Sequence, residues 1–437
     1  MKLKQLTLTN FRCFDKLEID FHDQLTVLIA PNGAGKTTVL DAVSVVLSSF
    51  VGAFDLGKAH GFALSDARYA LVSDSDPTPE QQYPVEVCAS FSEPDLADQS
   101  RLLSGPKNRT TVKDVAKLVD FGKQLMSAIR EKDVELPVIA YYPTGRLWKQ
   151  HKLMERKKIT SASRSMGYED CLSSASSYLQ MQIWMKSATF ASLQEKQMPD
   201  AYPTQSVSNQ LSAVKKAVET VLEHTGWHNF HYSITHDELA MQHNDLGILP
   251  VSLLSDGVRA MVSMAADLAW RCVKLNSARA EKAPETTSGI VLIDEVDMHL
   301  HPEWQQQVVG SLTAVFKRVQ FVLTTHSPQV ISTIHSDCIR ILDHGAVYNA
   351  PPGSKGAEST RMLKRLFQTE PRSVWDGNAK MLREYEQMVY DDDWDTSTAE
   401  KLRAELDKMF AGEEPKLTEL DEYIANRKWE RDLEEDS

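Results

Sequence analysis

The sequence predicts an α/β fold built on a mostly parallel β-sheet. A short apolar strand over residues 26–29 leads through a glycine-rich turn into an apolar-periodic helix that runs from residue 37 to about 50. Two later apolar runs, "GIVLI" and "VQFVL", each end in polar residues, and strands alternate with helices from about 248 to 342. Apolar strands that alternate with helices are typical of a parallel sheet covered on both faces.

The remaining elements follow from the spacing of apolar residues. The N-terminal stretch "MKLKQLTLTNFRCF" alternates as a strand does, and "YPVEVCASF" predicts another strand. Across 205–224 apolar residues recur in steps of three and four, which predicts an amphipathic helix. The other expected elements are, in order, a helix over 111–130, a strand over 136–142, a hairpin formed by "HYSI" and "LAMQ", and helices over 360–368, 377–390 and 398–410.

The charge of the chain is concentrated near its C-terminal end. The formal net charge is −13, and residues 391–437 hold 17 acidic and 7 basic residues, which makes −10. A DNA-facing surface on the remaining residues is therefore not excluded. The five cysteines form no C-x-x-C pair, and no apolar run is long enough to span a bilayer. These observations predict a cytoplasmic protein with no disulfide framework and no membrane partner.

The stretch "APNGAGKTT" (30–38) predicts a phosphate-binding loop. It joins a strand to a helix, so its backbone amides and the helix N-terminus can face an anion. Lys36 supplies a charge to the β- and γ-phosphates and Thr37 supplies a hydroxyl to Mg²⁺. Ala30 replaces the usual first glycine, so we expect an ordinary negative φ there. The expected contacts to ATP are Asn32, Gly33, Ala34, Gly35, Lys36, Thr37 and Thr38.

Two further strand ends carry polar residues suited to ATP hydrolysis. Asp294 and Glu295 follow the buried run "GIVLI", at the edge of the sheet where ligands bind in such folds. We expect Asp294 to hold Mg²⁺ through a water molecule and Glu295 to polarise the attacking water. His326 ends the next apolar strand and is expected to contact the γ-phosphate.

The stretch "LLSDGVRAMVSMAADLAWR" places Ser255 and Gly257 at the start of a helix. By itself this pattern is better explained by an ordinary N-cap than by an anion site. A phosphate loop, a Ser-x-Gly helix start, an Asp-Glu strand end and a strand-end histidine follow one another in the order typical of ABC-type ATPases. The chain resembles the RecF, SMC and OLD branch of these proteins, and "LTNFRCFDKLEIDF" and "LIDEVDMHLHPEWQQQVV" carry that likeness.

The resemblance implies an ABC-type P-loop ATPase head with an antiparallel N-terminal subsheet beside the mostly parallel sheet. Ser255 and Gly257 would then act in trans, capping the γ-phosphate bound by a second copy, so that ATP is sandwiched in a dimer. Arg12 matches a position that often reaches the nucleotide. Asp297, His299 and His301 form an alternative metal-ligand pattern, but the likeness places them in a loop that crosses the dimer interface.

Weaker likenesses indicate a narrower family. The stretches "LPVIAYYPTGRLW", "SRSMGYEDCLSSASS" and "GAESTRMLKRLF" resemble the PtuA ATPases of Septu antiphage systems and their retron-associated relatives. In that family the ATPase assembles with a separate HNH endonuclease of the PtuB type. The likeness implies a head lobe over 1–92, a mostly helical insertion over 93–224, a second head lobe over 225–345, and an acidic helical tail over 346–437 for assembly or partner docking.

Several alternatives remain open from the sequence. The basic run "RLWKQHKLMERKK" (146–158) fits nucleic-acid binding and a solvated loop equally well. The tail alternates charge with apolar residues, which suggests docking, although a solvated extension is the alternative. A RecF-like DNA-repair ATPase and a slow ATP sensor are rival functions. We expect no nuclease active site in this chain.

Overall fold

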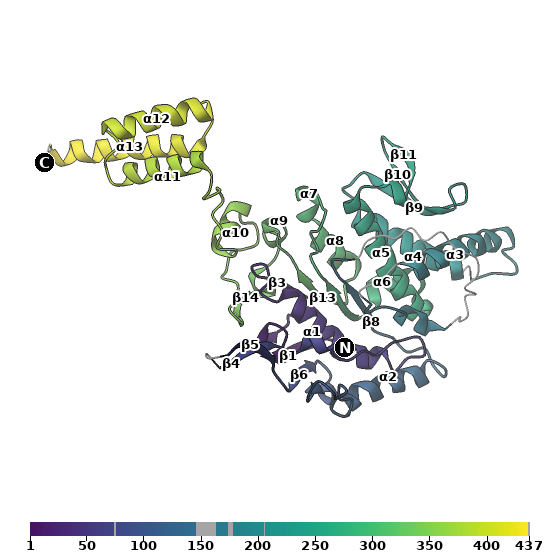
Figure 1. Cartoon of the computed structure of the whole chain (residues 1–437). Coiled ribbons are helices and arrows are strands. Elements are labelled where there is room, and N and C mark those ends of the chain that lie inside the picture. The colour runs from purple at the N-terminus through teal and green to yellow at the C-terminus, as the bar shows by residue number, and fades with distance from the viewer. Residues whose placement is uncertain (74–75, 146–162, 174–177, 205, 436–437) are drawn as a thin grey trace. The chain divides into compact units, whose positions relative to one another are not determined.

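A six-stranded sheet forms the centre of residues 1–362 (Figure 1). In this computed structural model its strand order is β15-β14-β3-β13-β12-β8, and only the edge strand β15 is antiparallel to its neighbour. The mostly parallel sheet is therefore confirmed. Its strands are β3 (Leu25–Ile29), β8 (Val138–Tyr142), β12 (Gly289–Ile293), β13 (Val319–Thr324), β14 (Ile339–Asp343) and β15 (Ala346–Asn349).

The structure describes residues 1–73, 76–145, 163–173, 178–204 and 206–435. The basic run over 146–158 lies outside the described residues. The chain divides into two units, 1–362 and 363–437, each described here by itself. All five cysteines are free. Within the described ranges, no helix is both long and apolar enough to cross a membrane.

An antiparallel sheet of order β2-β1-β6-β7 lies on the other side of helix α1 (Lys36–Val51) from the central sheet (Figure 1). Because α1 lies between two sheets, nearly all of its 16 residues are buried. The exceptions are Thr37 and Asp41. The antiparallel N-terminal subsheet is confirmed. Its strands are β1 (Leu3–Phe11), β2 (Phe14–Asp20), β6 (Val85–Phe91) and β7 (Gln99–Leu103).

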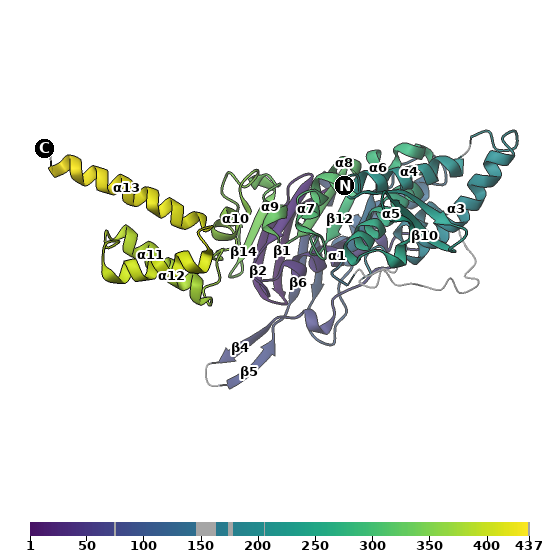
Figure 2. The ribbon, with the colours of Figure 1, turned by 90° about the horizontal axis from the view of Figure 1, so that it is seen from above.

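A helical layer covers the opposite face of the central sheet. Helix α5 (Asp256–Leu275) contacts β8, and α4 (Ser206–Val221) packs against both α5 and α8 (Val308–Val315) (Figure 2). The expected hairpin is present as β9 (Trp227–Ser233) and β10 (Glu238–His243), which are antiparallel. The other elements of this unit are α2 (Ala116–Ala128), α3 (Leu179–Gln197), α6 (Ala283–Thr286), α7 (Pro302–Gln305), α9 (Pro328–Ile331), β4 (Tyr69–Ser73), β5 (Asp76–Gln81) and β11 (Gly247–Pro250).

Two strands from the region predicted as a helical insertion, 93–224, belong to the sheets of the head. Its strand β7 completes the N-terminal sheet, and β8 forms the edge of the central sheet beside β12. Helix α2 packs on α1. The apolar run over 136–142 contains β8, which pairs with β12, about 150 residues later in the chain. That pairing joins segments far apart in the chain, so local sequence patterns do not reveal it.

The second unit contains three helices with a core of their own. α11 (Gly377–Tyr390), α12 (Ser397–Phe410) and α13 (Pro415–Glu435) follow α10 (Ser359–Arg365), which spans the boundary between the units. Eight apolar residues of the tail are buried together in this core: Leu382, Tyr385, Val389, Trp394, Ala399, Leu406, Leu417 and Leu420. These side chains therefore do not supply the docking surface that the sequence suggested. The unit also begins at residue 363, later than the predicted boundary at 346.

Candidate nucleotide-binding site

The loop between β3 and α1 has the backbone of a phosphate cradle. Gly33 and Gly35 adopt φ values of 79° and 96°, which side chains disfavour. A Cβ atom on Gly35 would lie 2.3 Å from the ring of Phe14, so the N-terminal sheet also requires glycine there. The φ of Ala30 is not positive, which confirms the ordinary backbone conformation expected there.

The side chain of Lys36 folds back over this loop. Its Nζ donates to the carbonyl oxygens of Ala30 at 2.9 Å and of Pro31 at 3.3 Å. Burial lowers the pKa of Lys36, and the nearby carboxylates of Asp294 and Glu295 act in the opposite direction. The ammonium group is thus held in the loop, where a phosphate would supply a better-matched partner than a neutral carbonyl.

Asp294 connects the phosphate loop to the ends of two central strands. The Thr37 hydroxyl donates to Asp294 Oδ2 at 2.8 Å, and the Thr324 hydroxyl at the end of β13 donates to Oδ1 at 2.6 Å. The Thr324 hydroxyl also accepts from the amide of Glu295 at 2.7 Å. One threonine therefore positions both acidic residues that follow β12.

Glu295 and His326 lie beside this network. Glu295 has a φ of 48°, a conformation that costs a non-glycine residue energy and that is common at functional sites. Burial, and then the charge of Lys36, lower the pKa of His326, so the imidazole is neutral at pH 7. A neutral imidazole can either donate to or accept from a phosphate oxygen or a water.

These residues enclose one cavity of about 260 Å³. Its lining contains most of the predicted nucleotide residues, namely Asn32, Gly33, Gly35, Lys36, Thr37, Thr38, Asp294, Glu295 and His326, together with Cys13. Ala34 does not line it; its amide donates to the carbonyl of Pro31 at 3.3 Å. The motifs are separated by up to 290 residues and meet here because their strands are neighbours in the sheet.

The helix start predicted to act in trans lies elsewhere. Ser255 is the N-cap of α5, its hydroxyl makes no capping hydrogen bond, and neither Ser255 nor Gly257 lines the cavity. A Cβ atom on Gly257 would lie 2.3 Å from the carbonyl oxygen of His299, so this glycine permits α5 to pack on the loop after Asp294. Their contact with a nucleotide on a second copy stays a prediction.

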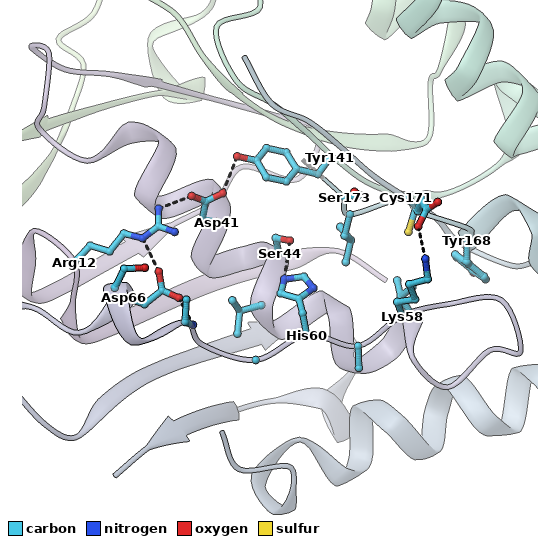
Figure 3. A pocket seen from close by; sticks show the side chains of 18 residues that line it. Arg12, Asp41, Ser44, Lys58, His60, Asp66, Tyr141, Tyr168, Cys171 and Ser173 are labelled. Atoms are coloured by element: carbon cyan, nitrogen blue, oxygen red, sulfur yellow. Dashed lines mark hydrogen bonds and ion pairs between the residues drawn. The ribbon is translucent and has the colours of Figure 1, made fainter. Parts of the chain in front are cut away.

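Arg12 takes part in a different set of contacts. It pairs with Asp41 of α1, and its Nε lies 2.8 Å from Asp66 Oδ1 (Figure 3). These carboxylates raise the pKa of Arg12 although burial opposes them. Arg12 lines a neighbouring cavity of about 630 Å³ and not the one around Lys36. Contact of Arg12 with the nucleotide stays a prediction.

The residues around Thr37 fit a magnesium ion. A hydroxyl and a carboxylate 2.8 Å apart are hard oxygen ligands of the kind Mg²⁺ takes beside nucleotide phosphates. Among the residues that the structure describes, no group of three or more histidine, cysteine or acidic side chains is arranged to hold a metal ion. Asp297 instead accepts a hydrogen bond from Thr325.

Two residues of the site did not emerge from the sequence analysis. Cys13 lies next to Arg12 and lines the Lys36 cavity, and Thr324 positions Asp294 and Glu295. Thr324 belongs to the stretch "LTTHS" that also contains His326. Thr324 is a polar residue at the end of an apolar strand, and this position was the signal in the sequence that could have identified it.

Comparison with known proteins places the chain in a family. The sequence profile of the AAA domain matches residues 5–223, which is half of the chain. A second profile, described as an AAA domain, putative AbiEii toxin, Type IV TA system, matches 175–332. Together they cover every motif of the site.

Named relatives agree with this assignment. The Retron Ec83 probable ATPase of Escherichia coli is 38% identical over 229 residues, 52% of this chain and 41% of that protein. The Retron Vc95 probable ATPase of Vibrio cholerae serotype O1 biovar El Tor is 25% identical over 390 residues, 78% of this chain and 74% of that protein. The Septu protein PtuA of Bacillus mycoides is 43% identical over 75 residues, 17% of this chain and 10% of that protein. The chain belongs to the AAA domain family, as an ABC-type ATPase of the RecF, SMC and OLD branch.

Proposed function

We propose that this protein is the ATPase subunit of an antiphage defence complex and that its nucleotide state controls a partner HNH endonuclease. The observation that carries the proposal is the likeness to the Retron Vc95 probable ATPase, which extends over 78% of this chain and well beyond the nucleotide motifs. The likeness to a Septu protein PtuA supports the same class. The HNH partner itself rests on the family resemblance.

The geometry around Lys36 supports binding and hydrolysis of ATP. The amides of the loop and the Lys36 ammonium would bind the phosphates, and Thr37 with Asp294 would hold Mg²⁺, which neutralises charge on the transferred phosphoryl group. Glu295 would accept the proton of the attacking water. Neutral His326 would orient that water or contact the γ-phosphate.

The location of Ser255 supports a dimeric working state. Ser255 occupies the N-cap position of α5, at a helix end that attracts anions, yet it does not line the cavity that holds the phosphate loop. A second copy that presents Ser255 to this cavity would complete the site. Opening and closing of such a dimer is a means by which ATP could change the surface offered to a nuclease.

The test is to express the chain with the products of its neighbouring genes and to measure three quantities. Co-purification of an HNH protein, phosphate release, and phage plaque counts should all be positive for the wild type. We expect Glu295→Gln to retain the partner while phosphate release and protection change together. If no HNH protein co-purifies and DNA binding alone depends on ATP, a RecF-like repair role replaces the proposal.

A further inference from the structure

Strand β8 ends in two tyrosines whose hydroxyl groups contact helices on opposite faces of the central sheet. Tyr141 and Tyr142 are both almost fully buried. Successive side chains of a strand point to opposite faces, so one tyrosine faces α1 and the other faces α5. These are the helices that follow the phosphate loop and that begin at Ser255.

On the first face, Tyr141 contacts the helix of the phosphate loop. Its hydroxyl donates to Asp41 Oδ1 at 2.8 Å, while the other oxygen of Asp41 pairs with Arg12 (Figure 3). Asp41 lies one turn after Thr37, and these two are the residues of α1 that are not buried. The hydrogen bond therefore fixes β8 to the turn of α1 next to the nucleotide cavity.

On the second face, Tyr142 contacts the helix that begins at Ser255. Its hydroxyl donates to Asp267 Oδ2 at 2.8 Å, and the same oxygen accepts from Arg271 Nε at 2.7 Å. Arg271 also donates to the carbonyl oxygen of Gly167 at 2.8 Å. Burial raises the pKa of Tyr142 well above its usual value, so its hydroxyl stays a donor. A buried carboxylate with this donor set has little freedom to move.

The backbone of β8 connects the two tyrosine contacts to β12, the strand that is followed by Asp294. β8 runs parallel to β12, and the amide of Asp294 donates to the carbonyl oxygen of Tyr142 at 2.9 Å. Asp294 in turn accepts from Thr37 of α1. Thus Thr37, Asp294 and the two tyrosines form a continuous chain of contacts from the phosphate loop to α5.

We infer that Tyr141 and Tyr142 are positioning residues that make the location of α5, and hence of Ser255, respond to nucleotide at Lys36 and Thr37. The inference rests on the proposed ATPase function and adds to it a route within one subunit. Neither hydroxyl lines the Lys36 cavity, so neither touches the nucleotide there. Their effect would pass through α1, Asp294 and α5.

The chain offers a matched control in Tyr168. This tyrosine is fully buried, and its hydroxyl donates at 2.7 Å to the carbonyl oxygen of Pro137, not to α1 or α5. Tyr168→Phe therefore removes a buried hydroxyl of the same kind without touching the contacts to Asp41 or Asp267. Loss of stability alone should be similar in all three phenylalanine variants.

The experiment compares Tyr141→Phe, Tyr142→Phe and Tyr168→Phe in the full chain. Three quantities are measured: the Kd for ATP, kcat for phosphate release, and hydrogen–deuterium exchange of the α5 peptides with and without ATP. We expect the first two variants to keep the wild-type Kd within roughly twofold and to lose roughly tenfold in kcat. ATP should protect α5 in the wild type and in Tyr168→Phe, and this protection should shrink in the two β8 variants.

Two results would overturn the inference. One is an unchanged ATP-dependent exchange of α5 in Tyr141→Phe and Tyr142→Phe, which would make them structural residues like Tyr168. The other is a wild-type α5 that does not respond to ATP at all. If Tyr142→Phe does not fold, Tyr141→Phe carries the comparison alone. Failure of the proposed ATPase function would be seen separately, as absent phosphate release in the wild type.

Discussion

At the scale of single residues, Lys36 is expected to set the affinity for ATP. Its ammonium group is held against two carbonyl oxygens of its own loop and faces Asp294 and Glu295. We expect Lys36→Ala to weaken ATP binding by roughly 100-fold or more, because the charge facing the phosphates is lost. Titration calorimetry with ATP measures this. Lys58→Ala, at an exposed lysine paired with Asp170, is the control and should bind as the wild type does.

A substitution of Glu295 tests ATP hydrolysis separately from ATP binding. Its backbone is held by Thr324, so Glu295→Gln should leave the site intact while the amide cannot accept a proton. Phosphate release should fall roughly 100-fold at unchanged ATP affinity. With hydrolysis blocked, the ATP-bound dimer should accumulate, which light scattering would detect. Wild-type turnover in Glu295→Gln would contradict the assigned role; Glu303→Gln, on the exposed start of α7, should behave as the wild type.

The lowered pKa of His326 predicts how kcat changes with pH. Burial lowers the pKa of His326 from its ordinary value of about 6.5, so the neutral form predominates at pH 7 and is lost as the pH falls through the lowered pKa. We expect kcat to be constant from pH 8 to 7 and to fall below pH 6.5. His326→Gln should remove that acid limb, whereas His335→Gln, at an exposed histidine, should retain it. A decline that begins above pH 7 would show that another group titrates.

Among the elements, the tail helices pack around a core of their own. Leu406 of α12 is fully buried among residues of α11 and α13. Leu406→Ala should destabilise this unit by about 2–5 kcal/mol, and it should leave ATP affinity unchanged. Limited proteolysis within 363–435 would report the loss. Met409→Ala on the same helix, at a partly exposed side chain, should have a small effect; equal sensitivity of both variants would argue against the core.

At the scale of the whole molecule, the boundary at 362 defines the informative truncation. A cut at 391 would leave α11 without the helices that bury Leu382, Tyr385 and Val389. The chain 1–362 retains every residue of the Lys36 cavity, so ATP binding should persist. We expect its assembly mass and its capture of the nuclease partner to fall. If both are unchanged, the docking surface lies within 1–362.

What the tail could still offer a partner differs from what its sequence suggested. The core buries eight of its apolar residues, but Trp375, just before α11, is 94% exposed, and Trp429 of α13 is 64% exposed. Exposed tryptophans are enriched where proteins bind one another. Trp375→Ala in the full chain is therefore compared with the truncated chain 1–362 for assembly mass and for capture of the nuclease partner.

The local sequence by itself determined the phosphate loop, the acidic strand end and His326, because each follows an apolar strand within a few residues. Such signals need only the spacing of neighbouring residues. Only the tertiary structure decided that β7 and β8 belong to the head, that Arg12 pairs with Asp41 and Asp66, and that the tail buries its own apolar residues. Each of these depends on which distant segments lie side by side. Burial and hydrogen bonding are properties of such contacts, so no pattern along the chain specifies them.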